Sequence, residues 1–214
     1  MIVSLLACSM GLEPLVADQD EALDAVPVEQ ALQGRTFELD LTGIAWIEPA
    51  GLGDALAALD MSNLLVHVAD EAEGQITLAV ALSDGDGGQD ACEPVHAFPA
   101  ADFSNNPRFQ VETAGMDITL GGQPAAFQDL YLAGIFDPAG DAWDHGRLST
   151  LLDVRDLSQV FDDRLDACEL AEALDGTCEP CADGVEACIP VSADSAYAWE
   201  IDADFDVTVD GDGC

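Results

Sequence analysis

A tryptophan, a histidine and an arginine lie close together in the middle of this 214-residue chain, at Trp143, His145 and Arg147. This mixture of side chains can hold a sugar or a carboxylate, because an aromatic ring stacks on the ligand while a cation pairs with it. The segment directly follows Asp137-Pro-Ala-Gly140, which is a β-turn sequence. We therefore favour a turn with one anchored tryptophan over a ligand site.

An acidic, glycine-rich loop between Ser83 and Asp90 is a second candidate site. Its carboxylates at Asp84, Asp86 and Asp90 are hard oxygen ligands that suit Ca²⁺. The EF-hand pattern is not met, because Gly88 stands at a ligand position and no glutamate falls at the twelfth. A solvated turn is favoured, and calcium is the one cofactor that the sequence indicates.

The clearest period-2 pattern lies between Tyr197 and Asp210, where hydrophobic residues alternate with acidic ones. The alternation predicts a strand that buries Tyr197, Trp199 and Phe205 and turns a row of carboxylates outward. Paired carboxylates can bind divalent cations or cleave glycosidic bonds, but every acidic strand offers such pairs. The sequence contains no GxSxG, HExxH, Walker or GxGxxG motif, so we predict a non-catalytic protein.

Near the N-terminus, Leu5-Leu6-Ala7-Cys8 resembles the lipobox of bacterial lipoproteins, in which a short hydrophobic run ends in a cysteine that becomes lipid-modified. The resemblance implies that residues 1–8 are a signal-peptide and lipobox remnant and that Cys8 carries acyl chains at a membrane surface. Ser9 directly follows Cys8, at the position where lipoproteins kept at the inner membrane often carry Asp. The resemblance therefore implies the cell envelope, either anchored at the outer membrane or periplasmic or extracellular.

The chain has seven cysteines, and an acylated Cys8 leaves an even six. Six cysteines can form three disulfides with 15 connectivities, among which the sequence does not choose. Export to an oxidising compartment favours disulfides over a zinc site built from the last four internal cysteines or a redox CxxC motif. The disulfide candidates are Cys92, Cys168, Cys178, Cys181, Cys188 and Cys214.

The charge balance is extreme, with 43 acidic residues, five basic ones and a net charge of −38. Such a surface repels phosphate backbones, so we predict no nucleic-acid partner, and it attracts cations. A GC-rich genome or a salty habitat would produce the same composition, and we favour that explanation of the acidity. No stretch approaches the roughly 20 hydrophobic residues that span a bilayer, so only the predicted lipid would attach the domain to a membrane.

Residues 9–34 read as a tether, and residues 35–214 as one β-rich domain. Two hydrophobic segments, Leu64 to Ala69 and Ile76 to Leu82, predict a β-hairpin in which His67 is buried or packed on a face. Further strands are predicted across 108–154, with a turn at Ala114-Gly115.

A change of pattern after residue 155 predicts a helical insert at 156–191. Asp156 and Gln159 have the spacing of a capping-box variant, hydrophobic residues then recur at helical intervals, and Gly176 stands where a left-handed cap ends a helix. Cys168 would lie on the buried side of this helix, beside the loop of Cys178 and Cys181. The insert is therefore predicted to be held to the sheet by disulfides.

These patterns predict an all-β, mainly antiparallel fold, either a β-sandwich or a partly open β-barrel, with a small disulfide-stapled helical insert. The predicted function is a membrane-anchored exported lipoprotein that acts as a binding or structural module. Its partners would be the membrane through the lipid and an envelope protein, a glycan or a hydrophobic ligand. Alternative functions are a carrier of a hydrophobic ligand, a calcium-dependent carbohydrate-binding or adhesion module and, least favoured, a glycosidase.

Overall fold

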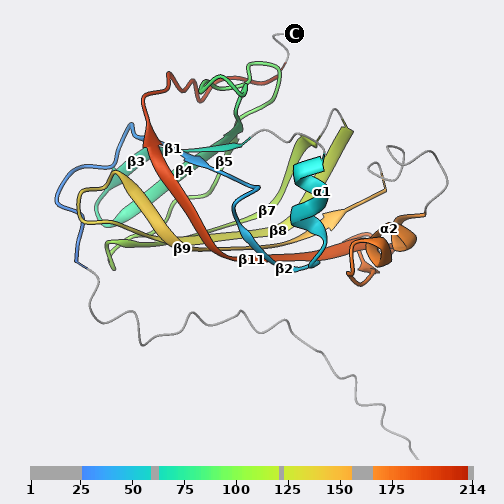
Figure 1. Cartoon of the computed structure of the whole chain (residues 1–214). Helices are drawn as coiled ribbons and strands as arrows, with labels where there is room; N and C mark the ends of the chain where they lie inside the picture. Colours follow the sequence, from blue (N-terminus) through green and yellow to red (C-terminus); the bar gives the residue numbers. More distant parts are fainter. Residues whose placement is uncertain (1–25, 59–62, 121–122, 156–165, 212–214) are drawn as a thin grey trace, which may run out of the picture.

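A single curled antiparallel sheet makes up most of the molecule, as the computed structural model shows for residues 26–58, 63–120, 123–155 and 166–211 (Figure 1). Within these ranges there are eleven strands and two short helices. The strands are β1 (Thr36–Leu39), β2 (Ala45–Glu48), β3 (Leu64–Ala72), β4 (Gln75–Leu82), β5 (His96–Ala97), β6 (Ala101–Asp102), β7 (Arg108–Leu120), β8 (Gln123–Phe136), β9 (Ala142–Asp153), β10 (Glu179–Pro180) and β11 (Glu186–Ile201). The helices are α1 (Leu52–Ala58) and α2 (Ala167–Ala173).

The strand order β5-β4-β3-β1-β11-β9-β8-β7 brings the two edges of the sheet back towards each other. Every paired neighbour is antiparallel. At the seam, β7 lies alongside β4 and alongside β6, which itself pairs with β4. The predicted all-β class is therefore confirmed, and of the two predicted architectures the molecule has the barrel-like one.

The hairpin of β3 and β4 is confirmed as predicted from the sequence. Its turn consists of Glu73 and Gly74, both with positive φ, at 53° and 77°. Two positive φ values suit the twist of a two-residue hairpin turn. His67 on β3 stacks on the ring of Phe205 with centroids 4.6 Å apart, and its Nδ1 lies 3.0 Å from Thr36 Oγ1. The prediction of a face-packed histidine is thus confirmed.

Strand β11 is the longest in the described structure, and it pairs with β1, β2, β9 and β10. Its pairing with β9 shifts register on both sides of Ala196, and the neighbouring Ser195 has a φ of 57°. A shift of this kind is a β-bulge, which bends the strand and increases the local twist. The bulged β11 therefore helps the sheet to curl.

The predicted faces of this last strand are wrong. Ala196 and Ala198 point inward and are fully buried, whereas Tyr197 and Trp199 are exposed. The interior has no room for larger groups here, because a Cβ added at Gly146 on β9 would lie 2.6 Å from the Ala196 Cβ. The strand also ends at Ile201, and residues 202–211 continue without strand structure.

Two further boundaries differ from the sequence-based predictions. The expected turn at Ala114-Gly115 is absent, since β7 runs through it as one strand of 13 residues. The fold also begins before residue 35, because Leu32 is completely buried and its backbone N–H donates to Glu71 Oε2 at 2.7 Å. The last part of the expected tether is therefore packed on the barrel, while residues 1–25, including Cys8, lie outside the described residues.

A short helix held by disulfides is confirmed, but the predicted bounds of the insert, 156–191, are wrong, because β10 and the start of β11 at Glu186 lie within them. Asp166 caps α2, and its side chain and that of Glu169 form a capping box, whereas the predicted start at Asp156 lies outside the described residues. Disulfides join Cys168 to Cys178 and Cys181 to Cys188. At the end of α2 the left-handed residue is Asp175, with φ 59°, and not the predicted Gly176. Cys92 is also disulfide-bonded, and Cys214 lies outside the described residues.

Helix α1 lies at the same end of the curled sheet as α2 (Figure 1). The Gly51 N–H, just before α1, donates to the Leu174 carbonyl, at the end of α2, at 3.0 Å. Leu52 and Leu56 are buried, so one side of α1 packs into the barrel. Neither helix of the described chain is long and hydrophobic enough to cross a membrane.

Candidate functional site

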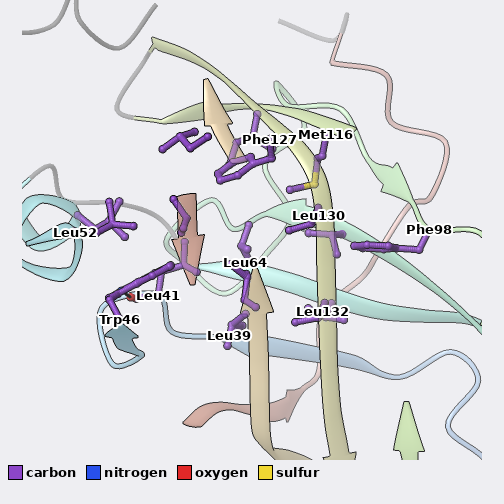
Figure 2. Close-up of a pocket in the computed structure, with 17 residues that line it drawn as sticks. Leu39, Leu41, Trp46, Leu52, Leu64, Phe98, Met116, Phe127, Leu130 and Leu132 are labelled. Atoms are coloured by element: carbon purple, nitrogen blue, oxygen red, sulfur yellow. Dashed lines mark hydrogen bonds between the residues drawn. The ribbon is translucent and has the colours of Figure 1, made fainter. Parts of the chain in front are cut away.

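An apolar cavity of about 60 Å³ lies inside the curled sheet (Figure 2). All of the side chains that line it are hydrophobic. They are Leu39, Leu41, Trp46, Leu52, Leu56, Leu64, Val66, Val80, Phe98, Met116, Ile118, Phe127, Leu130, Leu132, Leu148, Leu152 and Val191.

The alternation of the strands explains most of this lining, because every second residue of a strand in a curled sheet points inward. Leu64 and Val66 follow this rule on β3, as do Leu148 and Leu152 on β9. On β8 the side chains of Phe127, Leu130 and Leu132 line the cavity, so the alternation is interrupted between Phe127 and Leu130. The interruption lies at Asp129, which has a φ of 52° and falls within a register shift between β8 and β9.

The ends and the seam of the barrel contribute the remaining walls. Leu52 of α1 and Trp46 of β2 enter from one side of the cavity, and Phe98 and Met116 from the other (Figure 2). The Trp46 Nε1–H donates to the Leu41 carbonyl at 3.0 Å, so its one polar atom is satisfied by the backbone. Among the described residues, the cavity therefore presents hydrocarbon, aromatic and thioether surface with no polar group to orient a ligand.

The cavity has an energetic cost when it is empty. At about 24 cal/mol per Å³, a void of about 60 Å³ destabilises the fold by about 1.4 kcal/mol. An apolar cavity of about 150 Å³ binds benzene, so this one takes only a smaller group without rearrangement. Met116 is the lining residue best suited to move, since its unbranched thioether chain adapts to irregular spaces.

The candidate cluster at Trp143, His145 and Arg147 is not brought together on one surface. Trp143 is completely buried and meets Phe109 edge to face, with ring centroids 5.4 Å apart. His145 is exposed, and Arg147 Nε donates to Asp194 Oδ1 at 3.0 Å on the outer face. The anchored-tryptophan interpretation fits this arrangement, although the segment is part of β9 and not a turn.

The acidic loop is organised around Asp84, whose Oδ1 accepts the N–H groups of Asp86 at 2.8 Å and Gly88 at 2.9 Å. These two backbone hydrogen bonds hold the pKa of Asp84 below its usual range. Asp90 instead anchors the end of the loop, because its N–H donates to the Leu82 carbonyl at 2.9 Å. The geometry is that of a hydrogen-bonded turn, and the calcium hypothesis stays a prediction.

Within the described ranges, three potential metal ligands approach one another to within 4.8 Å only at Asp153, Cys181 and Cys188. There the two sulfurs are joined in a disulfide, and Asp153 is ion-paired with Arg155. Cys168 and Cys178 are likewise joined to each other. The alternative of a four-cysteine zinc site is therefore wrong for this oxidised state.

One carboxyl group of the described chain has a raised pKa, that of Asp141, because its side chain hydrogen-bonds to the Asp137 carboxylate. A glycosidase acid needs such a shift together with a cleft and a second carboxylate. Asp141 lies fully exposed in the turn between β8 and β9, so this pair does not form an enclosed acid site.

Comparison of the chain with protein-family models, with curated proteins and with solved structures finds no match. The sequence suggested a hydrophobic-ligand carrier only as an alternative function, and it did not identify the residues that line the cavity. Alternation marked several of its lining residues, but neither the closure of the sheet nor its bulges carries a local sequence signal.

Proposed function

We propose that this protein is an exported, lipid-anchored module of the cell envelope that binds a small uncharged hydrophobic ligand inside its barrel-like sheet and performs no catalysis. The observation that carries the proposal is the wholly apolar cavity of about 60 Å³. Filling this void would recover the contacts that its lining lacks, which gives an apolar ligand a reason to bind.

The chemistry of the ligand follows from the cavity and from the charge of the chain. No lining side chain can pair with a charge, and burying an unpaired charge costs several kcal/mol or more. The net charge of −38 also repels anionic compounds before they reach the domain. An alkyl group or a short acyl chain fits these constraints best.

The proposed location is supported by the cysteines. Two disulfides staple the insert, and Cys92 is disulfide-bonded as well, a pattern typical of oxidising compartments. The lipid would be attached at Cys8, in the sequence that resembles a lipobox. The intact mass of protein purified from the native membrane fraction tests both this location and the lipid attachment. We expect acylation at Cys8 and six cysteines that alkylate only after reduction, whereas a chain with Met1 and free thiols would refute both.

Solvent extraction of the native protein, followed by mass spectrometry of the extract, tests the ligand. Covalent acyl chains stay with the protein, so the extract contains only non-covalently bound compounds, and comparison with a cavity-filling variant identifies those that the cavity holds. We expect an uncharged hydrophobic compound from the wild type and much less from a Val66→Ile, Val80→Ile variant, which adds two methylenes to the lining. Val111→Ile adds a methylene elsewhere in the core and is the matched control. An empty extract from the wild type would refute the proposal.

A further inference from the structure

Two aromatic rings lie side by side on the outer face of β11. Tyr197 and Trp199 are two residues apart on the strand and so point to the same side. Their side chains are 51% and 37% exposed, and their ring centroids lie 6.2 Å apart with planes inclined by 28°. Together they form an aromatic pair that is open to solvent.

The fold does not require aromatic residues at these two positions. The inward positions beside them, Ala196 and Ala198, already make the contacts with the interior. An outward position of a central strand needs only good strand propensity, which threonine provides without exposing a large ring. The aromatic pair is therefore unexplained by packing or by secondary structure.

Carboxylates flank the pair on both neighbouring strands. Glu38 of β1 stands directly opposite Trp199, so the two side chains share a face. On the other side, Tyr197 faces the β9 bulge at Asp144 and His145, whose side chains are each 56% exposed. The nearby Arg147 is already ion-paired with Asp194. The pair is thus flanked by one carboxylate on each neighbouring strand, Glu38, which accepts a hydrogen bond from Asn63, and Asp144, which lies 3.8 Å from His145 Nε2.

We propose that this aromatic pair binds a segment of a partner protein that carries lysine or arginine at alternate positions. Cations bind over the faces of tryptophan and tyrosine rings, and the flanking carboxylates add ion pairs. The net charge of −38 supplies long-range attraction for a basic partner and repels anionic surfaces.

The spacing of the rings favours a polypeptide over a small free cation. Alternate residues of an extended chain lie about 6.6 Å apart, which matches the 6.2 Å between the two centroids. An extended segment can therefore place one basic side chain over each ring. Since β11 is paired with β1 and β9 along this part, the partner binds through side chains and not by adding a strand.

Fluorescence anisotropy with a labelled octapeptide of alternating Arg and Ser tests the proposal on the full chain, at about 150 mM salt to limit non-specific attraction. We expect binding, and no binding of the matched Gln–Ser peptide. A Tyr197→Thr, Trp199→Thr variant should raise the Kd about tenfold, because it removes two exposed cation–π contacts. Ile47→Thr is the matched control, since Ile47 on β2 is 54% exposed and lies outside the pair.

Three results would overturn the proposal. Equal affinity of the double variant and the wild type would mean that the general acidity binds the peptide. Equal binding of the Gln–Ser peptide would mean that binding needs no cationic side chain. Competition by free arginine at the concentration of the peptide itself would indicate a site for a small cation and not for a polypeptide. The variants alter only exposed positions, and an unchanged melting temperature verifies their fold.

Discussion

Val80 and Val111 are both buried in strands, but only Val80 borders the cavity. A methylene added at Val80 enters empty space, so Val80→Ile should stabilise the fold by about 0.8 kcal/mol. The same methylene at Val111 meets packed neighbours, and Val111→Ile should destabilise it by about 1–3 kcal/mol. Urea unfolding at constant m-value measures both changes. Equal effects of the two substitutions would mean that the void is not available to a side chain.

His67 gives the stability a dependence on pH. Burial lowers its pKa below the usual 6.5, so the folded state favours the neutral ring that stacks on Phe205. The unfolded chain takes up the proton first, so this contribution is complete above pH about 6.5 and declines as the pH falls below it. We expect His67→Gln to lose less stability than the wild type between pH 7 and pH 5. His96, whose pKa burial also lowers, is present in both proteins and cancels. Parallel pH curves for the two proteins would contradict this role of His67.

At the scale of the strand, sequence periodicity was a good guide to where strands form. It was a poorer guide to which face of each strand points inward. The β3–β4 hairpin was found because both strands are hydrophobic and a glycine turn joins them. The strand predicted between Tyr197 and Asp210 overlaps β11 only at 197–201, and there its faces are reversed. The pattern cannot show that small alanines fill a crowded interior while large rings point outward. The cavity shares this limitation, since the bulge at Asp129 changes which residues of β8 face inward.

The bulge at Ser195 should tolerate few side chains. Its φ of 57° lies in the left-handed region, which β-branched residues strongly disfavour. Ser195→Val should therefore destabilise the fold by about 1–3 kcal/mol, and Ser195→Gly should be neutral or slightly stabilising. Ser192→Val, on the same strand and without positive φ, is the control and should have little effect. Chemical denaturation of the three variants measures this, and a tolerated valine at 195 would show that the bulge can relax.

At the scale of the molecule, β11 links the two proposed sites. Val191 lines the cavity on the inner face, while Tyr197 and Trp199 lie on the outer face beyond the Ser195 bulge. One wall therefore separates an uncharged interior from a strongly negative exterior. The sequence predicted the exterior, since charge can be counted from composition. It could not predict the interior, because a cavity depends on how distant strands close on one another.

The net charge of −38 should make stability depend on salt. Like charges repel more strongly in the compact state than in the unfolded chain, so screening by NaCl should raise the free energy of unfolding. Because Asp84 already holds the acidic loop through backbone hydrogen bonds, calcium should add no more than magnesium at equal ionic strength. Thermal unfolding in the three salts measures both effects. A calcium-specific rise that Asp84→Asn abolishes would instead establish a calcium site, because asparagine keeps an acceptor for the turn and removes only the charge.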